Sequence, residues 1–325
     1  MKEKYQSIRG FIYKNPIIVI LIIYFIITSF TIPYFFTKRN LTNILIQSTD
    51  LIIVSCGLMF VLLNGGIDFS IIATMGLGSI IGALIMNTKT GLMANSPFGA
   101  YVAIAVMLLI GLVIGSINGL AVVFLKMPSF MATMANYLIF SGFALFLAQS
   151  KSIANLPNAF LFIGNGKLFN VIPFPVVITI FICIVMHIIL SRTVFGRCIY
   201  AVGTNHPTSF ISGIPVKKTI FTLFLICGLL AAIGGMITTS RLGAGRPLLN
   251  AERLMDFVAA IILGGTSIFG GKGTVTGTIL GALFIAVLSN SLGMLGLQWY
   301  TIMIVKGAFV LFGAWLDAFK TIRNF

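Results

Sequence analysis

Charged side chains are scarce in this chain, and their scarcity excludes a soluble globular protein. Of 325 residues only 8% are charged and six are acidic, whereas 58% are hydrophobic. A soluble domain carries about 25% charged residues. The composition therefore predicts an all-α polytopic membrane protein. Six acidic residues are also few for a proton-coupled carrier, which needs acidic side chains along its path.

Residues that bind metals or perform covalent chemistry are also few. The two histidines lie far apart, and the four cysteines show neither metal-ligand nor disulfide spacing, so we expect free thiols. No Ser/His/Asp set or catalytic carboxylate pair is recognisable. The run Gly270–Gly273 lacks the full phosphate-loop pattern and follows a helical segment. We expect no catalytic residue, metal or cofactor in this chain.

Basic residues outnumber acidic ones, and the formal net charge is +15. Such an excess suits nucleic-acid binding when it gathers on one polar face. Here the Lys and Arg residues are scattered between apolar runs. They are expected to face lipid headgroups and to set the orientation of the chain, so nucleic acid is not an expected partner.

Long apolar runs make up most of the chain. A membrane-spanning helix needs about 20 apolar residues. Ten runs fit: 16–36, 41–63, 68–87, 99–125, 129–148, 172–191, 219–239, 254–270, 274–294 and 299–318. They predict a single transmembrane domain over 16–325, preceded by a cytoplasmic segment 1–15. The first run is interpreted as a retained helix, with a cleaved signal peptide as the alternative. The Lys and Arg positions favour a cytoplasmic location for both termini.

The polar stretch Ser191–Thr219 separates two apolar runs and carries basic residues at both ends. This pattern predicts a cytoplasmic loop at 192–218. Its middle predicts a short amphipathic helix that has Pro207 in its first turn and is ended by Gly213 and Pro215. Its apolar face would consist of Phe210, Ile211 and Ile214. A short helix presented to the cytoplasm indicates a docking site for another protein.

Two apolar runs are interrupted by paired glycines, Gly65-Gly66 and Gly264-Gly265. Such breaks in corresponding parts of two halves indicate a substrate pathway. A neutral solute needs hydrogen-bonding groups there, and Thr74 is a further candidate. The predicted pathway residues are Asn64, Gly65, Gly66, Asp68, Ser70, Asp256, Gly264, Gly265, Thr266 and Ser267.

Four charged residues within or beside the apolar runs need partners. Asp68 fits two roles, a helix cap or a pathway residue. Asp256 has the same two roles, and it is also placed to pair with Arg253. Asp50 needs a polar partner or a wet cavity. Lys306 is expected to pair with an acid or to extend toward the membrane surface.

Two internal matches compete as signs of duplication. One aligns Gly65–Leu84 with Gly264–Leu283, which implies repeats of equal orientation. The other aligns Cys56–Gly66 with Cys227–Gly235 and implies inverted repeats. The residues alone do not decide between them, because glycine is common in the chain.

Three stretches carry a family resemblance, and they are Leu63–Ser70, Ala201–Ile214 and Ala259–Ala282. Together they resemble the membrane permease subunits of ribose-type (simple-sugar) ATP-binding-cassette importers, from about Leu41 to the end of the chain. The resemblance implies a type II importer-like fold of about ten helices with inverted halves. It also implies that the loop docks an ATPase, through Gly203, Asn205, Ser209, Ser212, Gly213 and Ile214.

The partners and the location also follow from this resemblance. They are a second permease copy or a paralogue, two cytoplasmic subunits that hold ATP and Mg²⁺, and an extracytoplasmic solute-binding protein, all at the bacterial inner membrane. The solute would be a small neutral sugar. A nucleoside or a sugar-derived signal molecule is the alternative cargo, and an ion-coupled carrier working alone is the alternative mechanism.

Overall fold

The computed structural model describes residues 16–94 and 96–323, which are mostly helical. The predicted segment 1–15 lies outside the described residues. The longer helices are α2 (Pro16–Thr31), α3 (Lys38–Leu62), α4 (Ile71–Met86), α5 (Gly99–Val123), α6 (Ser129–Ala148), α8 (Phe174–Arg192), α11 (Val216–Leu242), α13 (Val275–Met294) and α14 (Trp299–Arg323). The shorter elements are α7 (Asn158–Asn165), β1 (Lys167–Leu168), β2 (Ile172–Pro173), α9 (Val194–Thr204), α10 (His206–Ile211), η1 (Ala251–Arg253) and α12 (Leu254–Leu263).

Each of the ten predicted spans contains a helix, which confirms the predicted class. Six of these helices are long and apolar enough to cross a membrane, and three shorter apolar helices accompany them. The span predicted at 254–270 is wrong in its length. The helix α12 has 10 residues and covers about 15 Å, half of the hydrocarbon layer. The helix ends at Gly264, because the next residue, Gly265, adopts a left-handed conformation.

The bundle is built around α3 and α11. In α3 every residue from Ser48 to Leu62 is buried, and α11 packs against α3, α4 and α5. The α5–α11 contact is a backbone contact, because a Cβ on Gly228 would lie 2.2 Å from the Gly111 carbonyl oxygen. Small residues allow helices in a membrane to approach this closely.

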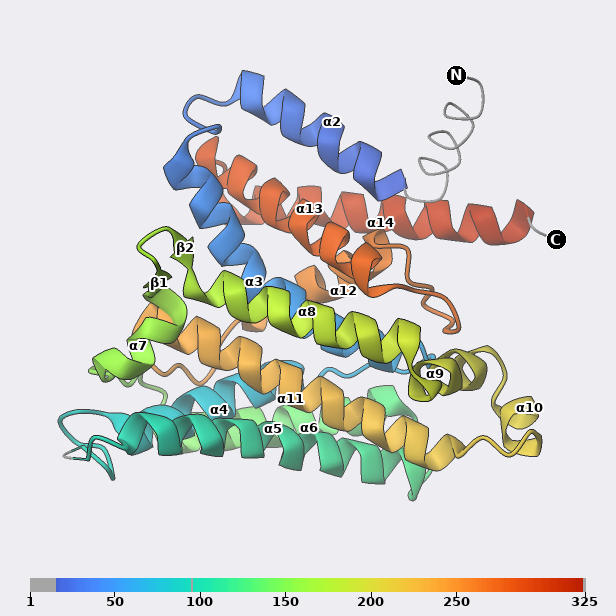
Figure 1. Cartoon of the computed structure of the whole chain (residues 1–325), viewed down its shortest axis with the longest axis horizontal. Helices are drawn as coiled ribbons and strands as arrows, with labels where there is room; N and C mark the ends of the chain where they lie inside the picture. Colours follow the sequence, from blue (N-terminus) through green and yellow to red (C-terminus); the bar gives the residue numbers. More distant parts are fainter. Residues whose placement is uncertain (1–15, 95, 324–325) are drawn as a thin grey trace.

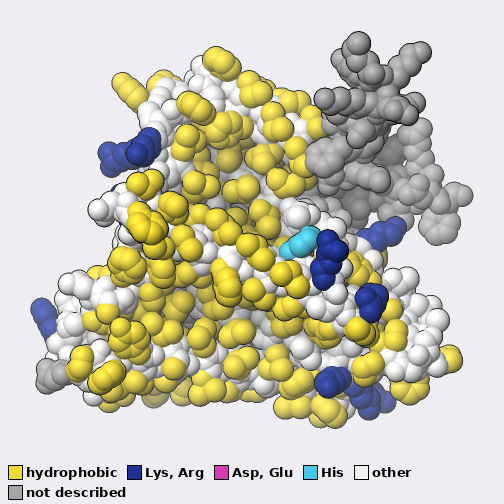
Figure 2. Space-filling model, in the orientation of Figure 1, with side chains coloured by type: hydrophobic (Ala, Val, Ile, Leu, Met, Phe, Trp, Pro, Cys, Tyr) yellow, Lys and Arg dark blue, Asp and Glu magenta, His cyan; other side chains and the backbone are white. Residues whose placement is uncertain are grey.

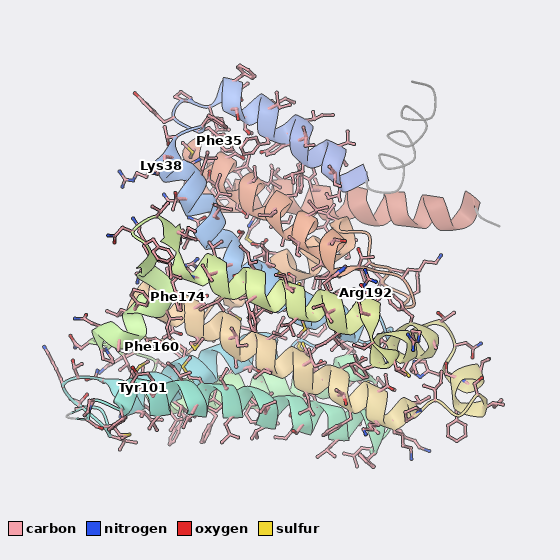
Figure 3. The ribbon with its side chains drawn as sticks, in the orientation of Figure 1. Phe35, Lys38, Tyr101, Phe160, Phe174 and Arg192 are labelled. Atoms are coloured by element: carbon pink, nitrogen blue, oxygen red, sulfur yellow. The ribbon has the colours of Figure 1, made fainter. Side chains whose placement is uncertain are left out.

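The helices run roughly along one direction, so the molecule has two ends (Figure 1). The helices α9 and α10 lie at one end, where α2 begins and α14 ends. The hairpin of β1 and β2, the helix α7 and the α2–α3 turn lie at the opposite end. Lys38 begins α3 at that opposite end, whereas Arg192 ends α8 near α9 (Figure 3).

Figure 2 shows an apolar surface between these ends, with Lys and Arg gathered toward the ends of the long axis. The helices α5, α6 and α8 have much of their apolar length exposed, including Phe143, Phe146 and Phe181. An exposed apolar band flanked by basic residues is the surface that a lipid bilayer requires.

Candidate functional site

The helices α3 and α12 end in the same backbone motif. Gly65 and Gly265 have φ angles of +72° and +84°, a conformation that glycine adopts without strain. In both turns the glycine N–H and the following N–H donate to carbonyls of the last helical turn. These two bonds define a Schellman ending. We call residues 63–70 the first glycine turn and residues 263–273 the second glycine turn.

The two glycine turns contact each other and α9. The Gly271 N–H donates to the Leu63 carbonyl at 2.8 Å. A Cβ on Gly203 of α9 would lie 1.9 Å from the same carbonyl oxygen, so α9 sits directly against the first turn. The Tyr200 hydroxyl donates to the Gly273 carbonyl at 2.6 Å, and burial raises the pKa of Tyr200, which keeps this donor protonated. The three segments form one junction.

A cavity of about 170 Å³ lies beside this junction. Its wall includes Asn64, Gly65 and Gly66 of the first turn, together with His206 at the start of α10. The Oδ1 atom of Asn64 is buried and has no hydrogen-bond partner among the described residues. Three of the predicted pathway residues, Asn64, Gly65 and Gly66, therefore share a space with the loop that was predicted to dock a partner.

The predicted residues of the second turn lie at its beginning. Gly264 packs against the backbone of Gly277 in α13, since a Cβ there would lie 2.5 Å from the Gly277 oxygen. Thr266 is buried, and the Ser267 N–H donates to the Lys272 carbonyl at 2.8 Å. These residues shape the turn that reaches Leu63.

Asp68 and Ser70 belong to a separate buried network at the start of α4. One Asp68 carboxylate oxygen accepts from the Ser70 N–H at 2.8 Å and from its hydroxyl at 2.7 Å. The Asn118 amide donates to the Ser70 hydroxyl at 2.6 Å, and Asn136 donates to Asn118 at 2.6 Å. Asp68 thus stabilises the start of α4 and connects α4, α5 and α6. Thr74 is buried and donates to the Ser70 carbonyl.

The predicted loop 192–218 contains two helices rather than one. The helix α9 was not expected and begins where the Thr193 hydroxyl accepts from the Gly196 N–H at 3.1 Å. The helix α10 has the predicted features. Asn205 caps it by accepting from the Thr208 N–H at 2.9 Å, and Pro207 lies in its first turn. Gly213, with φ of +79°, ends it.

The predicted docking residues divide into two groups. Gly203 packs against Leu63 and Ser209 is 4% exposed, so these two residues face the protein itself, and their role in docking stays a prediction. Asn205, Ser212 and Gly213 are exposed, and Ile214 is half-buried. The most prominent side chains on α10 are Phe210 and Ile211, which are 72% and 84% exposed. Two large apolar side chains exposed side by side in the sequence form an apolar patch on this loop.

At the opposite end of the bundle lies a larger cavity of about 620 Å³, which we call the polar vestibule. It opens between the first turns of α3, the end of α11, and the starts of α12 and α14. Its wall is mixed. The polar and charged side chains include Asn43, Gln47, Arg246, Asn250, Glu252, Arg253, Asp256 and Lys306, and the apolar ones include Leu248, Leu249 and Trp299.

An ion-pair network holds the wall of the polar vestibule. Asp50 is fully buried and pairs with Arg253, while Arg241 lies 3.8 Å from its other oxygen. Asp256 pairs with the Lys306 ammonium at 2.8 Å, and its carboxylate also lies 3.9 Å from the Arg253 guanidinium, as its position in the sequence predicted. The prediction that Lys306 pairs with an acid is confirmed, as is the need of Asp50 for polar partners. Buried charges paired in this way escape the large cost of isolated burial.

The structure therefore separates the predicted pathway residues into three places. Asn64–Gly66 and Gly264–Ser267 lie at or beside the glycine-turn junction, Asp68 and Ser70 lie in the α4 network, and Asp256 lies in the polar vestibule. Sequence reasoning missed Asn43, Gln47 and Trp299 as cavity residues. The spacing of Asn43 and Gln47, one helical turn apart with Ile44, Leu45 and Ile46 between them, was a usable signal.

Comparisons with known proteins agree with this architecture. Residues 40–313 match the family model described as the branched-chain amino acid transport system / permease component. The chain is 35% identical to the ribose import permease protein RbsC of Haemophilus influenzae, over 96% of this chain and 95% of that protein. It is 32% identical to the D-allose transport system permease protein AlsC of Escherichia coli, over 92% and 89%.

The ribose import permease of Bacillus subtilis is 35% identical over 93% of this chain and 91% of its own length. No solved structure was found to match. Relatives of this kind are transport subunits, not enzymes. The resemblance drawn from the three motif stretches is thereby confirmed, and the chain belongs to this permease family as a ribose-type importer permease.

Proposed function

We propose that this permease forms the membrane path for a small neutral sugar. An extracytoplasmic solute-binding protein delivers the sugar, and two cytoplasmic ATPase subunits drive its passage. The printed names of its relatives, which refer to ribose, D-allose and xylose, support the sugar as the cargo class. A second permease subunit, either another copy or a paralogue, completes the pore.

We propose that the docking surface is the outer face of α10. The observation that carries this proposal is the exposure of Phe210 and Ile211 on that face. Phe210 and Ile211 are too exposed to stabilise the chain itself, yet they lie on a helix that is firmly capped at both ends. An apolar pair on a rigid element suits insertion into a groove of a partner. The ATPase subunits are the partner that this permease class requires.

Motion at α10 has a direct mechanical route into the membrane domain. Asn205 joins α10 to α9, and α9 is seated on the first glycine turn through Gly203. When ATP binding closes the ATPase subunits, α10 moves as a rigid body with α9. The glycine turns then shift against each other, and access alternates between the two sides of the membrane.

A cross-linking experiment tests the docking surface. Ile211→Cys is placed in a background lacking Cys198, and a short bifunctional thiol reagent is added to native membranes that contain the ATPase subunit. We expect a cross-linked band that contains the ATPase. Ser209→Cys is the matched control, because this position lies on the same helix but faces inward, and it should give no band.

Failure of Ile211→Cys and Ser212→Cys to cross-link, with the thiols shown to be accessible, would contradict docking at α10. Uptake measurements in the same membranes separate the mechanisms. Uptake that requires ATP and the partner subunits supports the importer, whereas uptake that collapses with an ion gradient supports a carrier working alone. Uptake of nucleosides in preference to sugars would identify the alternative cargo.

A further inference from the structure

The polar vestibule has the composition of a ligand site rather than of a packed helix junction. Its volume of about 620 Å³ lies within the range of about 300–1,000 Å³ typical of small-molecule sites. We propose that it is a weak binding site for an unphosphorylated pentose or hexose. This inference rests on the proposed function and adds a specific place where the permease itself holds the sugar.

Two amide side chains in the vestibule are available to a ligand. Asn43 and Gln47 lie one turn apart on α3, are exposed, and form no side-chain hydrogen bond to any other described residue. An amide offers both a donor and an acceptor. Sugar hydroxyl groups need both kinds of partner, so this pair matches neighbouring hydroxyls on a sugar ring.

Trp299 supplies an apolar surface beside these amides. Its ring is 48% exposed at the start of α14 and lines the vestibule. The Lys306 ammonium lies 5.5 Å from the ring centroid and helps to fix the ring. A flat aromatic face with polar groups around it suits the C–H face of a sugar, which needs apolar contact while its hydroxyls remain hydrogen-bonded.

Two cations of the wall are committed to buried carboxylates, whereas the exposed Arg246 forms no ion pair within the described residues. Arg253 is paired with Asp50, and Lys306 is paired with Asp256. A phosphate group would compete for these cations and leave a buried carboxylate without its partner, which is costly. A neutral sugar can accept hydrogen bonds from the same cations without breaking either pair. The ion pairs therefore act as a fixed framework for the site.

The position of the vestibule suits the first step of transport. Its opening lies at the end of the bundle away from α9 and α10, where α3 begins and α11 ends. A solute released at that end enters the vestibule before it reaches the glycine turns. A transport site must also release its ligand, so the affinity is expected to be weak, on the order of millimolar.

The chain contains two tryptophans, which makes the site directly observable. In Trp315→Phe permease, reconstituted in lipid nanodiscs, Trp299 is the only tryptophan. We expect saturable changes in its fluorescence on titration with D-ribose, D-allose or D-xylose, and none with D-ribose 5-phosphate at equal concentration. No saturable change with any of these three sugars would overturn the proposal, as would tighter binding of the phosphate ester.

Variants on one helix provide the control. Asn43→Leu combined with Gln47→Leu should weaken sugar binding at least about tenfold. Thr42→Val should bind normally, because the Thr42 hydroxyl donates to the Lys38 carbonyl of its own helix. If the double variant bound sugar as tightly as the Trp315→Phe permease does, the proposed site would be contradicted. Emission spectra without sugar that match those of the Trp315→Phe permease would confirm that the vestibule is intact in the double variant and in the control.

Uptake assays keep the two proposals distinguishable. ATP-driven sugar uptake by the complete transporter, without a fluorescence response in the permease, would reject the vestibule site alone. A sugar-dependent response without ATP-driven uptake would support the site and reject the proposed function. If both hold, the double variant should raise the KM for uptake more than it lowers kcat, because it removes binding groups rather than the coupling path.

Discussion

At the scale of single residues, the Asp256–Lys306 pair is the sharpest stability feature of the vestibule. Both side chains are largely buried, and their charged atoms are 2.8 Å apart. Removing one partner of a buried pair leaves the other charge uncompensated, whereas replacing both removes the cost as well as the attraction. Removing one member of the pair is therefore expected to cost more stability than removing both.

We predict that Lys306→Met lowers the free energy of unfolding by about 3 kcal/mol. Adding Asp256→Asn should recover most of that loss, because no buried carboxylate then remains unpaired. Denaturant unfolding of the purified permease in mixed micelles measures all four members of this double-mutant cycle. Strictly additive losses would show that the two side chains are not coupled.

Residue types alone predicted some of these partners but not others. That Asp50 needs a polar partner follows from the cost of a charge in an apolar run, and Arg253, Asn250 and Thr238 supply hydrogen bonds to it. The residue types did not predict that Asp68 and Asp256 lie in different parts of the molecule. Both come close to helix starts in the sequence, and only the packing places one beside Asn118 and the other beside Lys306.

At the scale of elements, α9 is the part of the loop that connects docking to the membrane domain. Gly203 has no room for a side chain, since its Cβ would lie 1.9 Å from the Leu63 oxygen. A methyl group there must push α9 away from the first glycine turn. The helix α10 and its exposed face would remain intact, because they lie beyond Asn205.

Gly203→Ala is therefore predicted to reduce ATP-driven uptake by at least about tenfold, a change of about 1.4 kcal/mol in the barrier, while the ATPase subunits still copurify with the permease. Gly142→Ala is the control, since a Cβ at this exposed position of α6 has nothing within 4 Å. It should transport normally. Normal uptake by Gly203→Ala would show that the close contact of α9 with the first turn does not transmit motion.

The exposed face of α10 gives a second prediction at this scale. Phe210→Asp should abolish copurification of the ATPase without lowering stability, because the Phe210 side chain is 72% exposed and contributes little burial. The comparable change Phe169→Asp, at an 88% exposed turn between β1 and β2, should leave copurification unchanged. Retained binding by Phe210→Asp would place the docking surface elsewhere.

Elements with strong local signals could be predicted, whereas those set by packing could not. The caps and ends of α10 follow from Asn205, Pro207 and Gly213. The helix α9 was missed because its glycines at 196 and 203 argue against a helix, although close backbone contacts require them. Hydrophobicity also overestimated α12, since an apolar run does not reveal that the turn after it folds back to α9.

The repeat illustrates the same limit. The sequence match paired Gly65-Gly66 with Gly264-Gly265. In the structure, however, Gly65 corresponds to Gly265, because these two glycines have the positive φ angle and the equivalent hydrogen bonds, so the sequence match is one residue out of register. The inverted arrangement remains a prediction. What the structure adds is that both turns, distant in the sequence, meet at Leu63 and Gly271.

At the scale of the whole molecule, the two ends of the bundle carry different proposed functions. We propose that the end with α9 and α10 faces the cytoplasm and that the end with the vestibule and Phe169 faces the outside. Both α2 and α14 have an end at the α9–α10 side, which agrees with cytoplasmic termini even though α12 is too short to span the membrane. Basic residues near both ends make charge alone a weak guide to this orientation.

Labelling of single cysteines by a membrane-impermeant reagent tests the orientation, in a background where the four native cysteines are replaced. Phe169→Cys and Lys38→Cys should react in intact cells, because Lys38 and the turn between β1 and β2 that contains Phe169 lie at the vestibule end. Ser212→Cys should react only after the membrane is permeabilised. The reverse pattern would place α10 outside, where no ATPase can reach it, and would reject the docking surface, the route through α9 and the order of the transport steps together.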